Sequence, residues 1–593
     1  MFDLALNKLP VIGIRAVIDP RRKVYNRTYG QTQDMASSVA DYLSDHVKYP
    51  NSLPLKCVVY QKCVSNIVEA QECSDYFKHL NVGAVITVAT GWCYPLETML
   101  LDAGIPHAVW GFNGTERPGA VFLAALTAAC NLKGLPMFKI YGKEVREKDD
   151  KRIPEDVGRK LLSFTRAALA ASLMKGKSYL SLGTVSMGIS GCISDELFFQ
   201  QYLGMRISYV DMSEIQRRMN KGIYDPEELS KAIEWFSNNC KEGVDYNDPS
   251  LMHTKEQKAE DARDSIKLAI IVKDMMKGNQ KLQDMGYEEE AAGYGAVAGG
   301  FQGQRAWTDQ NANGDFMEAI LNSTFDWNGR REPIVIATEN DSSNAVSMLF
   351  GYLLTHTPQI FCDVRTYWSP ETVKRITGEE LEGRAKGGMI HLLNSGAAAL
   401  EGSGCLTKDG KPVIKPYWEM TEDDIKSCLQ STRWSPAMLD QFLAGGFSST
   451  YSTKGEMPVT ITRLNMVYGI GPVLQIAEGY TYEASPNIHM NLLGRTDPTW
   501  PSTWFVPNTI PGDAAYNDVY SVMESWGANH CSMSYGHIGS ELITLASMLR
   551  IPVTMHNVET NNLFRPALWK AYGTKELEAA DRYACAALGP LYK

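Results

Sequence analysis

Two acidic residues and one histidine in the C-terminal half of the chain could act together. Glu339 closes the apolar, strand-like run IVIAT, Asp363 closes the run QIFC, and His530 lies in the Gly- and Asn-bearing loop WGANHCSMSYGHIG. A carboxylate at the end of a buried strand is costly unless it is paired, hydrogen-bonded or bound to a metal. Two carboxylates and one imidazole suit an oxygen-preferring cation, Mn²⁺ or Mg²⁺, better than Zn²⁺. If the three residues converge in space, they form a metal site.

The surroundings of the two acids favour a ligand pocket, whereas the choice of histidine stays open. Polar or aromatic residues extend both motifs: Asn340, Asp341 and Ser342 follow the first, and Arg365, Tyr367 and Trp368 follow the second. His537 and His556 share the C-terminal region with His530, and spacing alone does not choose among the three. Cys362 and Cys531 adjoin candidate ligands, and packing beneath the site is a better interpretation of them than a catalytic thiol.

The elements that must position these residues begin with an alternating pattern. Up to about residue 170, strand-like runs occur at 11–18, 56–62, 82–90, 107–112 and 138–142, and helical patterns at 32–47, 97–104, 118–132 and 154–174. Apolar strands separated by amphipathic helices favour a parallel sheet covered on both faces. A second such unit begins near KSYLSLG, includes a long helical stretch at 256–278 and ends at EPIVIATEND.

The C-terminal part has a different pattern of predicted elements. Strand-like runs at 389–400, 412–420, 457–483 and 503–507 are separated by Gly, Asn and Pro, and a helix at 539–550 and an irregular tail follow. This spacing favours antiparallel or barrel-like structure. We therefore predict an α/β fold with two N-terminal α/β domains of mainly parallel sheets, at 1–172 and 173–352. A C-terminal α+β domain at 353–593, with antiparallel or barrel-like strands, would complete the metal site.

Composition excludes several functional classes. The 593 residues are too many for one core and suggest about three or four domains. A net charge of −10 and the lack of any basic run longer than RRK argue against nucleic acid as a partner. The N-terminus lacks a secretory pattern and no apolar run reaches the length of a membrane span, so we expect no membrane partner. Twelve scattered cysteines without a CxxC pair are typical of a cytoplasmic protein.

Common nucleotide and hydrolase signatures are missing from the sequence. The stretch ASLMKGKS resembles a P-loop, but Ala171 replaces the first glycine and the predicted order is helix then strand, the reverse of a phosphate cradle. The glycines of AAGYGAVAGGFQGQ lack the GxGxxG spacing of a dinucleotide site. Neither GxSxG nor HExxH occurs. The carboxylate pair is therefore the main chemical candidate.

Longer motifs occur in order along the chain. They are GFNGTERPGA, KGKSYLSLGTVSMGI, GFQGQRAWTD, FDWNGRREP, ATENDS, DVRTYWSPE, GPVLQIAEG, WGANH and TLASMLRIPVTMHNV. Together they resemble the L-fucose isomerase family, which includes enzymes that act as D-arabinose isomerases. The resemblance runs from about Gly13 to the final PLYK. Many long motifs in one order make it more specific than any single motif.

The resemblance implies a cytoplasmic, Mn²⁺-dependent aldose–ketose isomerase that assembles as a homohexamer and acts on a small-molecule sugar. It would convert L-fucose to L-fuculose, and D-arabinose to D-ribulose, through a cis-enediol. In this family the glutamate of ATEND and the aspartate of DVRTYW bind the metal and exchange protons with the sugar, and the histidine of GANH completes the ligands. These correspond to Glu339, Asp363 and His530, so similarity selects His530 where spacing does not.

Further residues are candidates for sugar contact: Arg15, Trp92, Met187, Gln302, Ser395 and Asn529. Trp92 in GWCYP could stack on the apolar face or methyl group of the sugar, and the polar residues could bind hydroxyl groups. Arg15 and Met187 could come from a neighbouring subunit. For each of the six, a structural role is at least as well supported by the sequence.

The chain departs from the family pattern at three places. GIRAVIDPRR stands where the family has GIRPTIDGRR, GWCYP where it has CWCYG, and ANHC where ANHG is frequent. The first two lie where the N-terminal domains could reach the sugar, so the resemblance specifies the reaction more closely than the substrate. The main alternative is an isomerase acting chiefly on D-arabinose or another aldose. A non-catalytic sugar-binding α/β protein is the alternative from a different class.

Overall fold

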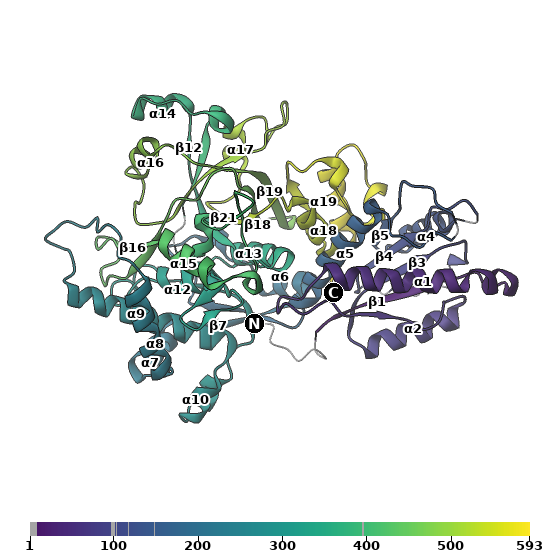
Figure 1. Cartoon of the computed structure of the whole chain (residues 1–593), viewed down its shortest axis with the longest axis horizontal. Coiled ribbons are helices and arrows are strands. Elements are labelled where there is room, and N and C mark those ends of the chain that lie inside the picture. The colour runs from purple at the N-terminus through teal and green to yellow at the C-terminus, as the bar shows by residue number, and fades with distance from the viewer. Residues whose placement is uncertain are drawn as a thin grey trace.

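The first sheet of the chain is parallel and covered by helices. The structure is a computed structural model that describes residues 9–95, 101, 104–116, 118–147, 149–393 and 396–592. Its N-terminal sheet has the order β2-β1-β3-β4-β5 (Figure 1). From β1 to β5 the strands are Val11–Val17, Cys57–Val59, Val82–Ala89, His107–Gly111 and Met137–Ile140. The helices are α1 (Arg22–His46), α2 (Ile67–His79), α4 (Gly119–Lys133) and α5 (Glu155–Met174).

Both faces of this sheet are buried, which explains its nearly unbroken apolar strands. Ile12 and Ile14 of β1 pack in one cluster with α1 and α5, whereas Val11 and Val17 pack in another with α2 and α4. The strands predicted for this region all form, and they pair in parallel as expected. The helices predicted at 32–47, 118–132 and 154–174 form as well, whereas the one predicted at 97–104 lies largely outside the described residues.

A second parallel sheet, of order β11-β8-β6-β7, carries the first candidate ligand at its edge. Its strands are β6 (Ser178–Leu182), β7 (Arg206–Val210), β8 (Ala296–Phe301) and β11 (Val335–Thr338). One face packs against α9 (Lys255–Lys277) and α12 (Asp315–Asn322), and the other against α13 (Ser342–Thr355). The shorter helices are α6 (Glu196–Phe198), α7 (Met212–Lys221), α8 (Pro226–Asn239), α10 (Gln280–Asp284) and α11 (Glu288–Ala291).

The C-terminal strands close into an antiparallel barrel of order β18-β21-β12-β13-β20-β19, in which β18 pairs again with β19. The strands are β12 (Ile360–Trp368), β13 (Met389–Leu393), β18 (Pro458–Val467), β19 (Gly471–Tyr482), β20 (Ser502–Pro507) and β21 (His530–Tyr535). β22 (Val553–Met555) adds to β19 in parallel. Alternate residues such as Cys362, Ile390 and Phe505 fill the interior. The predicted combination of parallel sheets and a barrel-like C-terminal part is therefore confirmed.

Helices and short hairpins surround the barrel, and two sequence predictions fail among them. The helices are α14 (Pro370–Thr377), α15 (Glu422–Ser431), α16 (Pro486–Leu493), α17 (Val519–Ser525), α18 (Gly539–Leu549) and α19 (Leu577–Leu588). The run 412–420 is not a strand, because Pro412 and Pro416 cannot donate to a ladder and the segment turns into a 3₁₀ helix at Tyr417–Glu419. The tail predicted to be irregular contains α19, whose buried Ala580 and Ala584 are four residues apart.

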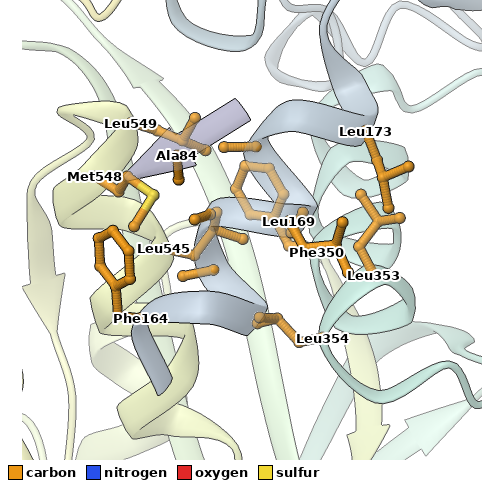
Figure 2. Packing of buried hydrophobic residues seen from close by; sticks show 14 of the residues in the cluster. Ala84, Phe164, Leu169, Leu173, Phe350, Leu353, Leu354, Leu545, Met548 and Leu549 are labelled. Atoms are coloured by element: carbon orange, nitrogen blue, oxygen red, sulfur yellow. The ribbon is translucent and has the colours of Figure 1, made fainter. Parts of the chain in front are cut away.

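Three helices join the sheets and the barrel in one apolar core. Leu169 and Leu173 of α5 contact the same cluster as Phe350 of α13 and Leu545 and Leu549 of α18 (Figure 2). Since each helix follows or precedes a different sheet, this junction fixes how the two parallel sheets and the barrel lie relative to one another. None of the described helices is long and apolar enough to cross a lipid bilayer.

Replacing Leu545 by Ala should destabilise the protein by about 2–5 kcal/mol, because it opens a cavity at the junction of the three helices. Leu545 is 0% exposed, whereas Leu132, the matched control, is 88% exposed. Thermal unfolding followed by circular dichroism should therefore show a lower midpoint for Leu545→Ala and an unchanged one for Leu132→Ala. Equal midpoints for the two variants would contradict the assigned core.

Candidate active site

Glu339 lies on the tight turn that leads from β11 into α13. β11 ends at Thr338, and Glu339 and Asn340 adopt left-handed backbone angles, with φ of 59° and 53°. Asp341 then caps α13, its side chain accepting a hydrogen bond from the Asn344 backbone N–H. Two successive non-glycine residues with positive φ are strained, and such strain persists where surrounding contacts hold the backbone.

Asn340 supplies those contacts. Its Nδ2 donates to Ser181 Oγ at 2.9 Å and lies 3.3 and 3.2 Å from the carbonyl oxygens of Gly183 and Thr184. Its Oδ1 accepts from the Tyr179 hydroxyl at 2.8 Å. Asparagine also tolerates the left-handed conformation better than most residues. The turn that carries Glu339 is thus fastened to β6 and the loop that follows it.

Asp363 and His530 are direct neighbours across two barrel strands. Asp363 of β12 pairs with His530 of β21, and the Val364 N–H donates to the Asn529 carbonyl oxygen beside them. Asp363 and His530 therefore form a non-hydrogen-bonded pair, in which side chains lie close together. Two sequence expectations need correction: Asp363 lies inside its strand rather than at the end, and His530 opens a strand rather than lying in a loop. Strand pairing set by distant segments extends both elements past the apolar runs.

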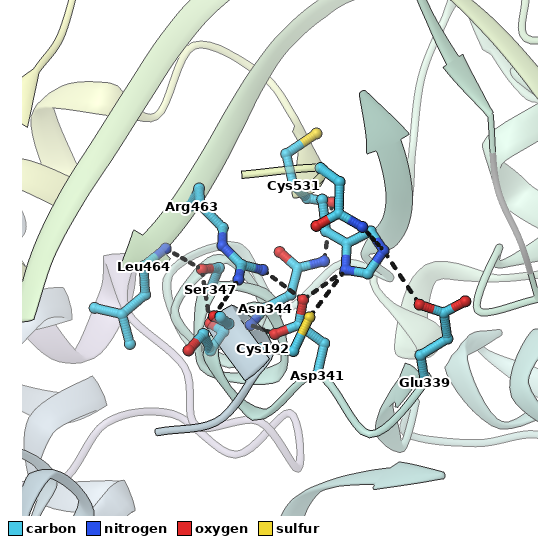
Figure 3. Close-up of polar contacts among 12 residues, drawn as sticks. Cys192, Glu339, Asp341, Asn344, Ser347, Arg463, Leu464 and Cys531 are labelled. Atoms are coloured by element: carbon cyan, nitrogen blue, oxygen red, sulfur yellow. Dashed lines mark hydrogen bonds and ion pairs between the residues drawn. The ribbon is translucent and has the colours of Figure 1, made fainter. Parts of the chain in front are cut away.

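The three predicted residues meet around one ring nitrogen. His530 Nε2 lies 3.4 Å from Glu339 Oε2 (Figure 3). It lies 3.5 Å from Asp363 Oδ1. His530 is 1% exposed and Glu339 is 9% exposed, so the cluster is sheltered from bulk water. His537 and His556, the rivals in the sequence, make other contacts: His537 Nε2 lies 2.9 Å from the Gly479 carbonyl oxygen, and His556 pairs with Glu578.

The other ring nitrogen faces a buried ion pair. His530 Nδ1 lies 2.7 Å from Asp341 Oδ2 and 3.6 Å from Cys192 Sγ. The same Asp341 oxygen accepts a hydrogen bond of 2.5 Å from Arg463 Nη1 (Figure 3). The sequence does not single out Arg463 or Cys192, although an arginine within the apolar strand run TITRLN is a signal that could have drawn attention.

These contacts shift the protonation of the cluster. Burial opposes the charge of Asp341, but Arg463 and His530 outweigh it and hold the pKa of Asp341 well below its usual range. Burial alone would lower the pKa of His530, yet its hydrogen bond with Asp341 leads the contacts that raise it well above normal. Burial raises the pKa of Asp363 to about 6, a shift opposed by His530 and increased by Glu339.

Two further buried acids, Asp315 and Glu318, lie near Glu339. Burial raises the pKa of Asp315 to about 7 and that of Glu318 well above normal, and Glu339 adds to both shifts. Trp500 Nε1 donates to Asp315 Oδ2 at 2.9 Å, and Thr338 Oγ1 donates to Glu318 Oε2 at 2.5 Å. The sequence does not single out either acid, because both lie in the first turn of a helix, where acids are common.

The two sides of His530 differ in how well they suit a cation. Cys192, Asp341 and His530 bring possible ligand atoms within 4.8 Å of one another. However, the guanidinium of Arg463 already neutralises Asp341 and would repel a cation there. On the Nε2 side, Glu339 Oε2 is buried and has no hydrogen-bond partner among the described residues. A buried, unpartnered carboxylate oxygen beside a second acid and an imidazole nitrogen fits a divalent metal.

The chain is similar to known proteins along almost all of its length. Three family models match consecutive parts of the chain: the first N-terminal domain of L-fucose isomerase at 9–176, the second N-terminal domain at 177–356, and the C-terminal domain at 392–556. L-fucose isomerases of Streptococcus pneumoniae serotype 4 and of Streptococcus pneumoniae strain 70585 are each 55% identical over 585 residues, 98% of this chain and 99% of theirs. The chain belongs to the L-fucose isomerase family.

The candidate residues for sugar contact fall into two groups. Asn529 lies at the cluster, with Nδ2 2.9 Å from His530 Nε2. Gln302 follows β8, the neighbour of β11, and its Oε1 accepts from the Thr184 N–H at 2.9 Å. Met187 lies in the loop after β6, is 48% exposed and has a φ of 46°. Ser395 lies outside the described residues.

Arg15 and Trp92 are not brought to the cluster within one chain of this L-fucose isomerase family member. Arg15 belongs to the first sheet and Trp92 follows its strand β3, and Figure 1 shows this sheet on the right, apart from β12 and β21. Arg15 lies within β1, is 3% exposed, and donates from Nε to Thr87 Oγ1 at 2.9 Å. Trp92 follows β3 and lines a cavity of about 180 Å³ together with Asp19 and Arg27.

Changing Asn340 should show how the turn at Glu339 is held. Asn340→Ala removes the side-chain contacts to β6 and places a residue that resists positive φ, whereas Asn340→Gly removes the same contacts but relieves the strain. The loss of buried hydrogen bonds should cost about 1–3 kcal/mol, and the strain about 1 kcal/mol more. Thermal midpoints should therefore fall in the order wild type, Asn340→Gly, Asn340→Ala. A glycine variant less stable than the alanine variant would refute the strained turn.

Proposed function

We propose that this protein is a metal-dependent aldose–ketose isomerase that converts L-fucose to L-fuculose, and D-arabinose to D-ribulose, through a cis-enediol. The observation that carries the proposal is the approach of Glu339 Oε2 and Asp363 Oδ1 to within 3.4 and 3.5 Å of His530 Nε2. These are the residues to which the family resemblance assigns the metal and the proton transfer. The L-fucose isomerases that are 55% identical over almost the whole chain support the choice of sugar.

Glu339, Asp363 and His530 would hold the cation, and Mn²⁺ is the metal that we assign, with Mg²⁺ as the alternative. Carboxylate oxygens with a single imidazole are typical of these cations, whereas Zn²⁺ more often takes a Cys or a second His. When bound, the cation supplies Lewis-acid stabilisation of the negative charge that develops on the substrate oxygens. Burial of the ligands strengthens such stabilisation because it excludes water.

Glu339 and Asp363 would also move the proton. One carboxylate removes the proton from C2 of the open-chain aldose to give the cis-enediol, and delivery of a proton to C1, with transfer of the O2 hydroxyl proton to O1, completes the ketose. General acid–base work of this kind contributes about 10²–10⁴-fold to a rate. Arg365 Nη1 lies 3.2 Å from Asp363 Oδ2 and orients that carboxylate while the other oxygen faces His530. The two acids approach from the β11–α13 turn and from β12, so they can serve different carbons.

Contacts to the rest of the sugar would come partly from another copy of the chain. Arg15 lies in β1 and Trp92 just after β3, and the first sheet lies apart from β12 and β21 (Figure 1), so a homohexamer in which one subunit covers the site of another would use them. Gln302, Ser395 and Asn529 would come from the subunit that holds the metal, and Met187 could, like Arg15, come from the neighbouring copy. All twelve cysteines are free thiols, which supports a cytoplasmic location.

The substrate alternatives differ at one end of the sugar. L-fucose and D-arabinose share their stereochemistry from C2 to C4, so a site that grips this end accepts both, and the methyl group of L-fucose distinguishes them. An isomerase acting chiefly on D-arabinose or another aldose is therefore the second candidate. The departures from the family pattern at GIRAVIDPRR and GWCYP, both in the first sheet, bear on that choice.

Removal of metal should abolish isomerisation. Protein treated with a chelator and dialysed should regain activity with Mn²⁺, and less with Mg²⁺ or Zn²⁺, because the ligands are mainly carboxylate oxygens. The measurement is ketose formation from L-fucose and D-arabinose side by side, with L-fucose giving the higher kcat/KM. No ketose from any aldose with Mn²⁺ supplied would favour the non-catalytic sugar-binding alternative.

Glu339→Gln should lower kcat by about 10²–10⁴-fold, because the amide cannot accept the proton. Exchange of the substrate C2 hydrogen with solvent deuterium, followed by NMR, measures proton abstraction separately from product formation. Glu422→Gln makes the same chemical change on an exposed helix turn and should leave both rates unchanged. If Glu339→Gln binds Mn²⁺ and still exchanges the C2 hydrogen at the normal rate, Glu339 is only a ligand.

A further inference from the structure

A buried ion pair contacts Nδ1 of His530, the ring nitrogen that faces away from Glu339 and Asp363. The proposed reaction does not itself use this ion pair. Asp341 Oδ2 lies 2.7 Å from Nδ1 of the ring and 2.5 Å from Arg463 Nη1. The side chain of Asp341 is 0% exposed and that of Arg463 is 1% exposed. Burying two charges so completely costs free energy unless each is paired and hydrogen-bonded. An ion pair buried this completely beside one ring nitrogen therefore suggests a role in holding the ring.

We infer that Asp341 and Arg463 are positioning residues, which hold the His530 ring with its proton on Nδ1 and its Nε2 lone pair directed at Glu339 and Asp363. The inference rests on the proposed function, because Nε2 matters only as a metal ligand. A carboxylate behind a ligand histidine fixes the tautomer and the ring orientation, and its loss typically weakens metal binding.

Both oxygens of Asp341 are committed. Oδ1 accepts from the Asn344 backbone N–H at 2.8 Å, and Oδ2 accepts from Arg463 and from His530. An ionised carboxylate can only accept hydrogen bonds, so in the neutral ring, the form that can bind a metal, the proton lies on Nδ1. Nε2 is then an acceptor, as its contact of 2.9 Å with Asn529 Nδ2 also requires. The carboxylate therefore determines which ring nitrogen faces Glu339.

Arg463 fixes Asp341 in turn. Its Nη1 donates to Asp341 while Nη2 donates to the Gly191 carbonyl oxygen at 3.2 Å, and Nε donates to Asn465 Oδ1 at 3.3 Å. A planar guanidinium can make these bonds in fixed directions, which the ammonium group of a lysine cannot. Arg463 thus ties the turn after β11 to β18 and to the loop that contains Cys192.

Neighbouring bonds keep the helix behind Asp341 in register with the barrel. Asn344 Nδ2 donates to the carbonyl oxygen of Cys531, next to His530, at 3.0 Å. One turn later, Ser347 Oγ accepts from the Leu464 N–H at 2.9 Å (Figure 3). Ser347 stabilises the same helix and strand but does not touch the His530 ring or Asp341. It therefore provides a matched control for a purely structural effect.

Asp341→Asn tests the inference, because either orientation of the amide sets a donor against a donor. If the amide nitrogen takes the place of Oδ2, it faces Arg463 and the ring N–H; if it takes the place of Oδ1, it faces the Asn344 N–H. The dissociation constant for Mn²⁺, measured by calorimetric titration of metal-free protein, should rise about 10–100-fold. A crystal structure of the metal-free variant should show Nε2 displaced from Glu339 and Asp363.

Two further variants keep the test decisive. Arg463→Lys, which retains the charge, should weaken Mn²⁺ binding less than Arg463→Met. Ser347→Ala should lower the thermal midpoint but leave the Mn²⁺ dissociation constant and the ring position unchanged. Wild-type Mn²⁺ affinity with an undisplaced ring in Asp341→Asn would overturn the inference. If wild-type protein does not bind Mn²⁺, the proposed function fails, whereas a displaced ring in metal-free Asp341→Asn would still support the positioning role.

Discussion

The buried contact between Asp341 and His530 joins the second parallel sheet to the barrel, and the geometry of the candidate metal centre depends on it. Asp341 follows the turn that carries Glu339, whereas His530 and Asp363 belong to paired barrel strands. Because the three ligands come from two different sheets, the distances between them depend on how accurately the two sheets are positioned relative to each other. The bond between Asp341 and His530, reinforced by Arg463, sets that junction at the point where accuracy matters.

The apolar core also positions the sheets relative to one another, but less precisely. Leu173 of α5, Phe350 of α13 and Leu549 of α18 lie in one cluster, so helices attached to all three sheets share their packing. Hydrophobic burial is strong but not directional, and it brings elements together without fixing side chains to a fraction of an ångström. Directional hydrogen bonds then add what burial lacks. The protein separates these functions in space, with the apolar junction on one side of α13 and the polar network at its first turn.

The acids around Glu339 reduce the stability of the fold, because burying ionisable groups costs free energy. Asp315, Glu318 and Asp363 are buried close enough for Glu339 to raise the pKa of each, and a core built only for stability would exclude such a group. Their raised pKa values show that ionising these acids together costs free energy, and a bound divalent cation would lower that cost. Arg463 pairs with Asp341, whereas on the Nε2 side of His530 the buried Glu339 Oε2 has no hydrogen bond among the described residues and Asp363 pairs with the exposed Arg365. The distribution of charge, as well as the distances, thus favours one face of the ring for the metal.

The sequence by itself determined the strand and helix pattern of both parallel units and the barrel-like strands of the C-terminal part, because burial produces a local periodic pattern of apolar residues. It also singled out the two carboxylates, because each ends an apolar run. It did not choose among His530, His537 and His556 without a family resemblance, and it missed α19 and the role of Arg463. Asp341 and Arg463 are separated by 122 positions, and Asp341 and His530 by 189. Contacts over such separations arise from strand register and helix packing, which composition and periodicity do not encode. Only the tertiary structure could therefore decide which nitrogen of which histidine faces the two acids.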